Sequence, residues 1–147
     1  MNSEDLPFVL VGWREKIALP EIGIHFIRCK IDTGARTSSL HAFDVETFER
    51  DGVQRVRFEV HPLRRNDDKV VSCEAEVTGF RDVTNSGGLA EHRPVIRTPI
   101  VMAGRRWEIE VNLTDRATMG YRMLLGRSAM QGTIFVDPAA SYRWPKP

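Results

Sequence analysis

The tripeptide Asp32-Thr33-Gly34 follows an apolar, strand-like run that ends at Ile31. A glycine at this place would let the backbone turn sharply and would hold the Asp32 carboxylate at the end of the strand. Two carboxylates that face one another can perform general acid–base catalysis, because one accepts a proton while the other donates one. The sequence contains no second Asp-Thr-Gly or Asp-Ser-Gly, so a facing pair would require two copies of Asp32 related by a two-fold axis.

A second segment, Leu124 to Arg127, reads Leu-Leu-Gly-Arg and has the composition needed to support such a loop. The helix-compatible residues Ser128 to Met130 follow it. In retroviral-type proteases, an apolar-apolar-Gly-Arg segment crosses under the Asp loop and leads into a short helix. The order and the residue types of the two segments therefore resemble the retropepsin-like fold of aspartic proteases.

The stretch from Asp32 to Leu40 is similar to the signature of a small bacterial family often labelled "ATP-dependent zinc protease". This resemblance extends from about Phe8 to Pro138, and it implies an all-β, single-lobed closed barrel that acts as a homodimeric aspartic endopeptidase. Members of that family are encoded beside, or fused to, ATP-grasp ligases of the RimK type, which add glutamates to a ribosomal protein. The resemblance therefore implies a functional link to such a ligase and an acidic peptide or protein substrate, such as the glutamylated ribosomal protein.

The resemblance also implies roles for individual residues. Asp32 would supply the catalytic carboxylate of each subunit, Thr33 would form hydrogen bonds across the subunit interface, and Gly34 would present backbone groups to the substrate. The alternative for Asp32 is an Asx-type turn that closes a strand without any catalysis. The residues expected to bind substrate are Ala35, Arg36, Thr37, Gly87, Gly88 and Arg127, and those expected to support the loop are Leu125 and Gly126.

Arg36 departs from the viral pattern, in which an Asp at this position pairs with the arginine of the Gly-Arg segment. Arg36 and Arg127 would therefore place two guanidinium groups near the catalytic loop. A buried pair of like charges is costly, so we expect at least one of them to meet a carboxylate. That carboxylate would belong to an acidic ligand or to a residue such as Glu21, Asp44 or Asp115, unless both arginines are simply exposed to water.

This departure also supports a second function class. In a binding module with the same fold, Arg36 and Arg127 would grip carboxylates in two-point fashion, as planar guanidinium groups do. Asp32 would then be merely structural.

The alternation of apolar and polar residues with a period of two dominates the chain and indicates an all-β fold. Helical character is confined to a short piece after Gly126. Two hairpins are predicted, and the first, made by 56–60 and 71–77, should have one face in water. In the second, Asn112 is one of the polar residues that alternate with apolar ones. The predicted strand segments are 8–13, 22–31, 56–60, 71–77, 94–102 and 107–113.

The segment from Asp82 to Arg93 is predicted to hold a flap, a mobile lid that closes over the substrate. It contains the paired glycines Gly87 and Gly88, which suit a hairpin tip, although it could equally be a surface loop. The resemblance implies an inserted β-hairpin within 43–80, which makes Pro62 to Lys69 the rival flap.

The chain has 147 residues and is 41% hydrophobic, which fits one domain with a core of about 8–138 and a tail of 139–147. The net charge of +1 gives no drive toward nucleic acid or a membrane surface. The N-terminus is acidic and no apolar stretch is long enough to span a membrane, so we expect a cytoplasmic protein. Cys29 and Cys73 should be buried free thiols. The tail could strap the dimer or hang free, and we favour the strap.

No metal or other cofactor is expected despite the zinc in the family label. The sequence lacks His-Glu-x-x-His, and the four histidines, His25, His41, His61 and His92, are widely separated in core-alternating or loop positions. It also lacks Gly-x-x-x-x-Gly-Lys, so no ATP-binding loop is expected in this chain.

Overall fold

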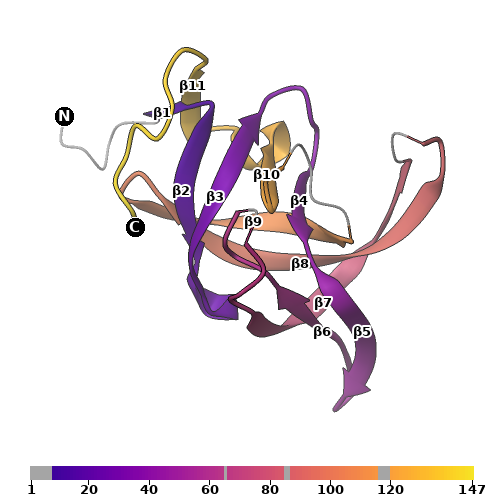
Figure 1. The fold of residues 1–147 in the computed structure, drawn as a ribbon. Coiled ribbons are helices and arrows are strands. Elements are labelled where there is room, and N and C mark those ends of the chain that lie inside the picture. Colours follow the sequence, from indigo (N-terminus) through magenta and orange to yellow (C-terminus); the bar gives the residue numbers. More distant parts are fainter. Residues whose placement is uncertain (1–7, 65, 85–86, 116–119) are drawn as a thin grey trace.

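A computed structural model describes residues 8–64, 66–84, 87–115 and 120–147 (Figure 1). Short strands with alternating burial make up most of these residues, as the period-two pattern requires. The strands are β1 (Val9–Gly12), β2 (Arg14–Leu19), β3 (Ile24–Asp32), β4 (Ser38–His41), β5 (Phe43–Arg50), β6 (Val53–Val60), β7 (Val71–Thr84), β8 (Ala90–Met102), β9 (Arg105–Thr114), β10 (Met123–Gly126) and β11 (Ile134–Asp137). Two single-turn 3₁₀ helices are η2 (Pro20–Ile22) and η3 (Arg127–Ala129).

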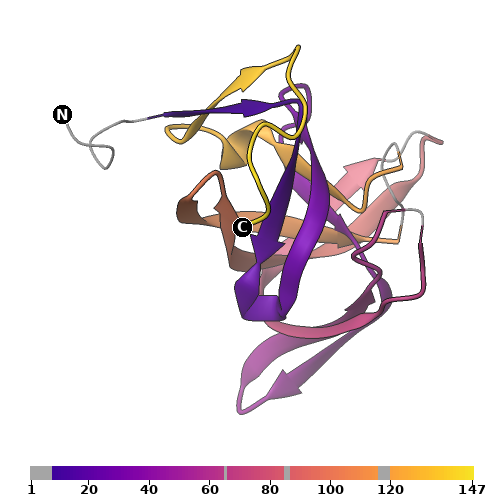
Figure 2. The same cartoon turned by 60° about the vertical axis from the view of Figure 1, so that its left-hand side comes forward.

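The strands form a closed β-barrel, as predicted. One sheet has the order β2-β3-β10-β4-β9-β8-β7-β6-β5, and a pairing of Ala18 in β2 with Val101 in β8 closes its first six strands into a ring. The strands β7, β6 and β5 continue from β8 as an antiparallel extension, and β5 and β6 project away from the barrel (Figures 1 and 2). A separate two-stranded parallel sheet joins β1 to β11.

One continuous hydrophobic core fills the barrel and reaches the extension. Fully buried side chains come from the barrel strands, such as Ile27 and Leu125, and from the inserted hairpin, such as Phe58 and Val60. Each such side chain contributes roughly 1.5–3 kcal/mol by its removal from water. The inserted hairpin predicted within 43–80 therefore packs on the same core as the barrel.

The two hairpins predicted from alternation are confirmed. Phe58 in β6 lies opposite Cys73 in β7, and Thr98 in β8 lies opposite Ile109 in β9, across the turn at Gly104. The strands β2, β4, β5, β10 and β11 were not predicted as strands. In the part of the chain that is described, no helix has the length and apolar character needed to cross a lipid bilayer.

Asn112 alternates with apolar residues in the sequence, yet only 2% of this residue is exposed. The end of β9 runs beneath the loop that follows Asp32, where both faces of the strand are covered. Asn112 donates from Nδ2 to the carbonyl oxygen of Ser38 at 2.8 Å. Alternation cannot predict this, because it assumes one wet face along the whole strand.

Both cysteines are free and buried, as predicted. Burial raises the pKa of the Cys29 thiol far above its usual range, and it raises the pKa of Cys73 to about 12. The thiolate is the reactive form, so both cysteines should be inert toward Ellman's reagent at pH 8 in the folded protein. Both should react once the chain is unfolded in guanidinium chloride. Rapid labelling of either thiol without denaturant would contradict this burial.

The buried carboxylate of Glu15 fixes the C-terminal tail. Its Oε2 accepts hydrogen bonds from the backbone N–H of Gly12 at 2.7 Å and of Arg143 at 3.1 Å, and its Oε1 accepts from the N–H of Trp144 at 3.1 Å. The indole of Trp144 also donates to the carbonyl oxygen of Leu10 at 2.7 Å. The tail therefore does not hang free but packs against its own chain, and its role as a dimer strap remains a proposal.

Replacing Glu15 with glutamine should lower the free energy of unfolding by about 2 kcal/mol. The neutral amide loses the charge-assisted hydrogen bonds and turns an NH₂ group toward backbone N–H donors. Differential scanning calorimetry would report this as a decrease in Tm of about 4–8 °C. The same change at Glu49, an exposed residue of β5, is the control and should leave the Tm almost unchanged. Equal Tm values for both variants would refute the clamp.

Candidate active site

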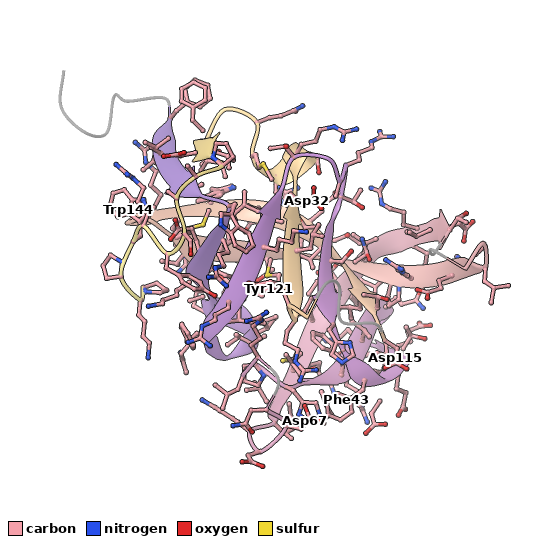
Figure 3. All side chains as sticks on the ribbon, turned by 45° about the horizontal axis from the view of Figure 1, so that its top comes forward. Asp32, Phe43, Asp67, Asp115, Tyr121 and Trp144 are labelled. Carbon is pink, nitrogen blue, oxygen red and sulfur yellow. The ribbon has the colours of Figure 1, made fainter. Side chains whose placement is uncertain are left out.

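The two sequence motifs lie side by side at one end of the barrel. β10 pairs in parallel with β3, so that Leu125 lies beside Ile31 and Gly126 lies beside Asp32. Figure 3 labels Asp32 at the end of β3. On its other edge β10 pairs with β4, the strand that follows the Asp32 loop. The Leu-Leu-Gly-Arg segment therefore runs under the loop between its two flanking strands.

Gly126 is required by a close backbone approach. A Cβ built at Gly126 would lie 2.5 Å from both the carbonyl carbon and the carbonyl oxygen of Thr37. No side-chain adjustment can relieve this contact, because the obstructing atoms belong to the backbone. The neighbouring Leu125 is fully buried, so its packing anchors the crossing.

Two sets of hydrogen bonds hold the loop that follows Asp32: one within the loop itself and one from the backbone of η3. The N–H of Gly34 donates to the Asp32 Oδ1 at 2.9 Å, which is the Asx-type contact considered as the alternative for this residue. The N–H of Arg127 donates to the carbonyl oxygen of Ala35 at 2.8 Å. The N–H of Ser128 donates to the carbonyl oxygen of Arg36 at 3.1 Å. The loop is thus tied to η3 by its backbone, while the Asp32 side chain stays partly exposed.

Gly34 serves the loop differently from the prediction. Its φ is not in the left-handed region, so a sharp turn does not require glycine here. A Cβ at Gly34 would instead approach the Asp32 Oδ1 at 3.1 Å. The absence of a side chain leaves room for the carboxylate and for the hydrogen bond to it.

Arg36 and Arg127 are both exposed, so of the alternatives left open by the sequence, exposure to water is the one that the structure shows. The NH1 group of Arg127 donates to the carbonyl oxygens of Thr33 at 3.4 Å and Gly34 at 3.2 Å. The ion pairs between described residues include neither arginine, and Glu21 pairs instead with Arg106. Solvent screens these charges, so no internal carboxylate is needed.

A buried polar network beneath the loop was missed by the sequence reading. The hydroxyl of Ser38 accepts a hydrogen bond from the N–H of Gly126 at 3.0 Å. The Oδ1 of Asn112 accepts from Arg93 NH1 at 2.9 Å and from the Ser39 hydroxyl at 3.1 Å, and its Nδ2 reaches the hydroxyl of Thr37 at 3.5 Å. The only sequence signal was the run of hydroxyl residues directly after Arg36.

The predicted flap is the tip of the β7–β8 hairpin, whose last described pair joins Thr84 to Ala90. Gly87 and Gly88 lie at this tip and are exposed, and Gly88 has a φ of 82°. Arg93 in the same hairpin reaches the polar network beneath the Asp32 loop through Asn112. Positions 85 and 86 of the predicted segment lie outside the described residues.

The strands of this hairpin extend further than predicted, which leaves a short connection instead of a long polar loop. The rival flap, Pro62 to Lys69, is placed elsewhere. Its Arg64 donates to the carbonyl oxygen of Gly120 at 3.1 Å, and its Asp67 pairs with Arg122 at 2.7 Å. These contacts join the segment to Gly120 and Arg122, which precede the first residue of β10. Asp32 lies beside the last residue of β10, at the opposite end of that strand.

The histidines are dispersed. Among the described residues, no group of three or more His, Cys, Asp or Glu side chains is arranged to hold a metal ion. His92 lies within β8 instead of the predicted loop, where it stacks on Phe80 and bonds to Asp82 at 2.8 Å. His61 stacks on Phe43 with a centroid distance of 4.3 Å.

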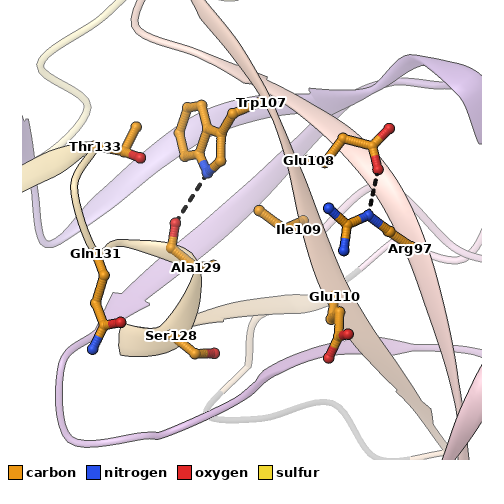
Figure 4. A pocket seen from close by; sticks show the side chains of 9 residues that line it. All are labelled: Arg97, Trp107, Glu108, Ile109, Glu110, Ser128, Ala129, Gln131 and Thr133. Atoms are coloured by element: carbon orange, nitrogen blue, oxygen red, sulfur yellow. Dashed lines mark hydrogen bonds and ion pairs between the residues drawn. The ribbon is translucent and has the colours of Figure 1, made fainter.

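In the part of the chain that the structure describes, three cavities have residues of η3 in their lining, and the smallest, of about 20 Å³, is lined by Thr37, Asn112 and Ser128 among others. The remaining two are larger. One has a volume of about 250 Å³, and Trp107 donates to the carbonyl oxygen of Ala129 at 3.0 Å on its wall (Figure 4). None of the predicted site residues lines this cavity. The other is an open groove of about 410 Å³ whose lining includes Thr33, Arg127 and the apolar Phe135. The second groove therefore adjoins the Asp32 loop.

Comparison with proteins of known sequence agrees with this geometry. The chain is 46% identical over 137 residues to a Desulfotalea psychrophila protein named "Probable alpha-L-glutamate ligase", covering 93% of this chain and 30% of that protein. A Parasynechococcus marenigrum protein of the same name is 45% identical over 135 residues, covering 92% and 29%. The chain thus spans about three tenths of the length of these curated relatives.

The fold has a solved counterpart. A crystal structure of a Legionella pneumophila protein of unknown function is 31% identical and superimposes with a TM-score of 0.72, covering 92% of this chain and 97% of that one. Residues 10–147 match the RimB-like family, described as "Retropepsin-like aspartic endopeptidase RimB". This chain therefore belongs to the RimB-like family of retropepsin-like aspartic endopeptidases.

Proposed function

We propose that this chain is one subunit of a homodimeric aspartic endopeptidase in which each subunit contributes one Asp32. The observation that carries this proposal is the position of Asp32, whose partly exposed carboxylate stands at the end of β3 on a loop tied to Gly126 and Arg127. Because hydrogen bonds to the backbone of η3 fix this loop, its carboxylate is presented in one direction, as a preorganised catalytic group requires.

The surface beside the loop supports a dimer. The lining of the groove next to Thr33 includes apolar side chains, and one of them, Phe135, is 59% exposed. On the adjoining strand β1, Leu10 is 39% exposed. Among the described residues β11 pairs only with β1, so its other edge is open. A second subunit seated here would cover the apolar side chains and bring its own Asp32 loop against the first.

Catalysis would follow from the two facing carboxylates. At hydrogen-bond distance both cannot be ionised together, so they share one proton. The ionised Asp32 accepts a proton from a water molecule, which attacks the scissile carbonyl carbon. The protonated Asp32 of the other subunit donates to the carbonyl oxygen. The first Asp32 then gives the proton that it took from water to the amide nitrogen, and the C–N bond breaks to release the amine and the new carboxyl group. Arg127 contributes by fixing the carbonyl groups of Thr33 and Gly34.

We infer an acidic substrate, with a glutamate-extended ribosomal protein as the leading candidate. The curated relatives carry the name of a glutamate ligase, and a chain of added glutamates is the product that such a ligase would make. Arg36 is exposed beside the loop and outside the ion pairs of the described residues, so it is available to a carboxylate. Gly87 and Gly88 at the hairpin tip would close over the bound peptide.

The test offers the purified protein two substrates that differ only in charge: a carrier with a C-terminal oligoglutamate tail and the same carrier with oligoglutamine. Mass spectrometry should detect cleavage of the glutamate tail, and light scattering should give the mass of a dimer. Activity per subunit should fall on dilution as the dimer dissociates. An active monomer, or a stable dimer that cleaves neither tail, would overturn the proposal.

The binding module remains the second candidate, and the structure gives it less support. Its proposed grip needs both Arg36 and Arg127 to face a ligand. Arg127 is already committed to two carbonyl oxygens of its own loop. Binding of oligoglutamate without any cleavage would favour the module.

A further inference from the structure

Four cations stand in direct cross-strand register on the outward face of β2 and β3. Arg14 lies opposite Lys30, and Lys16 lies opposite Arg28; we call these four residues the basic ladder. The side chains that alternate with them are buried, so the ladder occupies the solvent side. Like charges directly opposite one another destabilise a sheet, so this arrangement needs a reason other than stability.

Aromatic rings contact three of the four cations, Arg14, Lys16 and Arg28. The guanidinium carbon of Arg14 lies 4.6 Å from the centre of the Trp13 ring and 4.5 Å from that of Tyr142. The ion pairs between described residues include none of Arg14, Lys16 and Arg28. A cation–π contact orders a cation without neutralising it. The positive charges of Arg14, Lys16 and Arg28 are therefore available to an external anion.

Two further cations widen this surface. The guanidinium carbon of Arg64 lies 4.2 Å from the Tyr121 ring centre, and the Lys146 ammonium lies 4.6 Å from that of Phe26. Arg14 donates to the Tyr121 hydroxyl at 2.7 Å, which joins the ladder to the Arg64 side. The surface thus combines residues from β2, β3, the connection between β6 and β7, the segment before β10 and the tail.

Two residues of the ladder lie on the same face of β3 as the candidate catalytic residue Asp32. Arg28, Lys30 and Asp32 alternate along β3 and therefore share one face of the strand. Same-face residues on a strand are about 6.7 Å apart, so Lys30 lies one step and Arg28 two steps from Asp32. Figure 3 shows Tyr121 lower along β3 and Asp32 at its end. An extended peptide has the same two-residue spacing.

We propose that the basic ladder is an exosite that binds an extended acidic peptide and guides it to Asp32. Alternate carboxylates of such a peptide would meet the successive rungs of the ladder. This inference rests on the proposed endopeptidase function and names the surface that selects its substrate. Nucleic acid fits less well, because the rings that would stack with bases are covered by cations and the chain's net charge is only +1.

The binding test uses the full chain with Asp32→Asn, so that the probe stays intact, and fluorescein-labelled hexaglutamate as the probe. Adding Lys16→Gln and Arg28→Gln should weaken binding about tenfold or more, as measured by fluorescence anisotropy. Binding should also weaken as NaCl rises from about 50 to about 300 mM. The matched control, Arg57→Gln with Arg97→Gln, removes two exposed cations from β6 and β8 and should change the Kd less than about twofold.

The outcomes separate this inference from the proposed function. If the ladder variant and the control variant lost equal amounts of affinity for hexaglutamate, the exosite would be overturned. It would also be overturned if an oligothymidine bound more tightly than hexaglutamate and its binding depended on the ladder. With Asp32 intact, the ladder variant should lose its preference for oligoglutamate over oligoglutamine tails. Unaltered preference would overturn the exosite while leaving the endopeptidase intact. Ladder-dependent binding by a chain that cleaves nothing would preserve the exosite and refute the endopeptidase. Circular dichroism melts should confirm that each variant is folded.

Discussion

Replacing Asp32 with asparagine should lower the turnover of an oligoglutamate-tailed substrate by at least about 10³-fold. The amide cannot accept a proton from the attacking water, and in a homodimer the change removes both carboxylates at once. The asparagine oxygen can still accept the hydrogen bond from the Gly34 N–H, so the loop should keep its shape. The fall should therefore appear in kcat, measured by mass spectrometry of the released tail, while the Tm stays within a few degrees.

Asp51→Asn is the matched control for this experiment. Asp51 is exposed in the turn between β5 and β6 and has a φ of 53°, a conformation that asparagine also adopts readily. Its replacement should leave turnover unchanged. If the Asp32 variant retained wild-type turnover, the cleavage would have to come from other groups or from a contaminating protease. A mixed dimer with one Asp32 and one asparagine should also be inactive, because the mechanism needs both carboxylates.

Replacing Gly126 with alanine should lower the free energy of unfolding by about 3 kcal/mol or more. The new methyl group would lie 2.5 Å from the Thr37 carbonyl group, so the backbone of β10 or of the loop must move. Denaturant unfolding followed by circular dichroism would measure the loss. Activity should fall as well, because Gly126 lies beside Asp32 in the parallel pair of β10 and β3.

Gly79→Ala provides the control, because a Cβ at Gly79 in β7 meets nothing within 4 Å and its φ lies outside the left-handed region. This variant should be within about 0.5 kcal/mol of wild type. Similar unfolding curves for the two variants would show that the close approach at Gly126 is not obligatory.

Local sequence patterns determined the hairpins, the two motifs of the candidate site and the burial of the cysteines. The period-two alternation predicted the hairpins that became β6–β7 and β8–β9, because the side-chain period of a strand depends only on its own backbone. Through the family resemblance, the glycine at position 126 and the carboxylate at position 32 pointed to a crossing of the Gly126 segment under the Asp32 loop. Burial of Cys29 and Cys73 followed from the same alternation.

Only the tertiary structure decided the contacts between distant segments. Arg127 donates hydrogen bonds to carbonyl groups of the Asp32 loop. Glu15 accepts hydrogen bonds from the tail, and Asn112 lies buried beneath the Asp32 loop. The opposition of Lys16 to Arg28 likewise depends on the register of two strands. A one-residue change of register would exchange the two faces of a strand, so these contacts depend on how the whole barrel closes and not on any single segment.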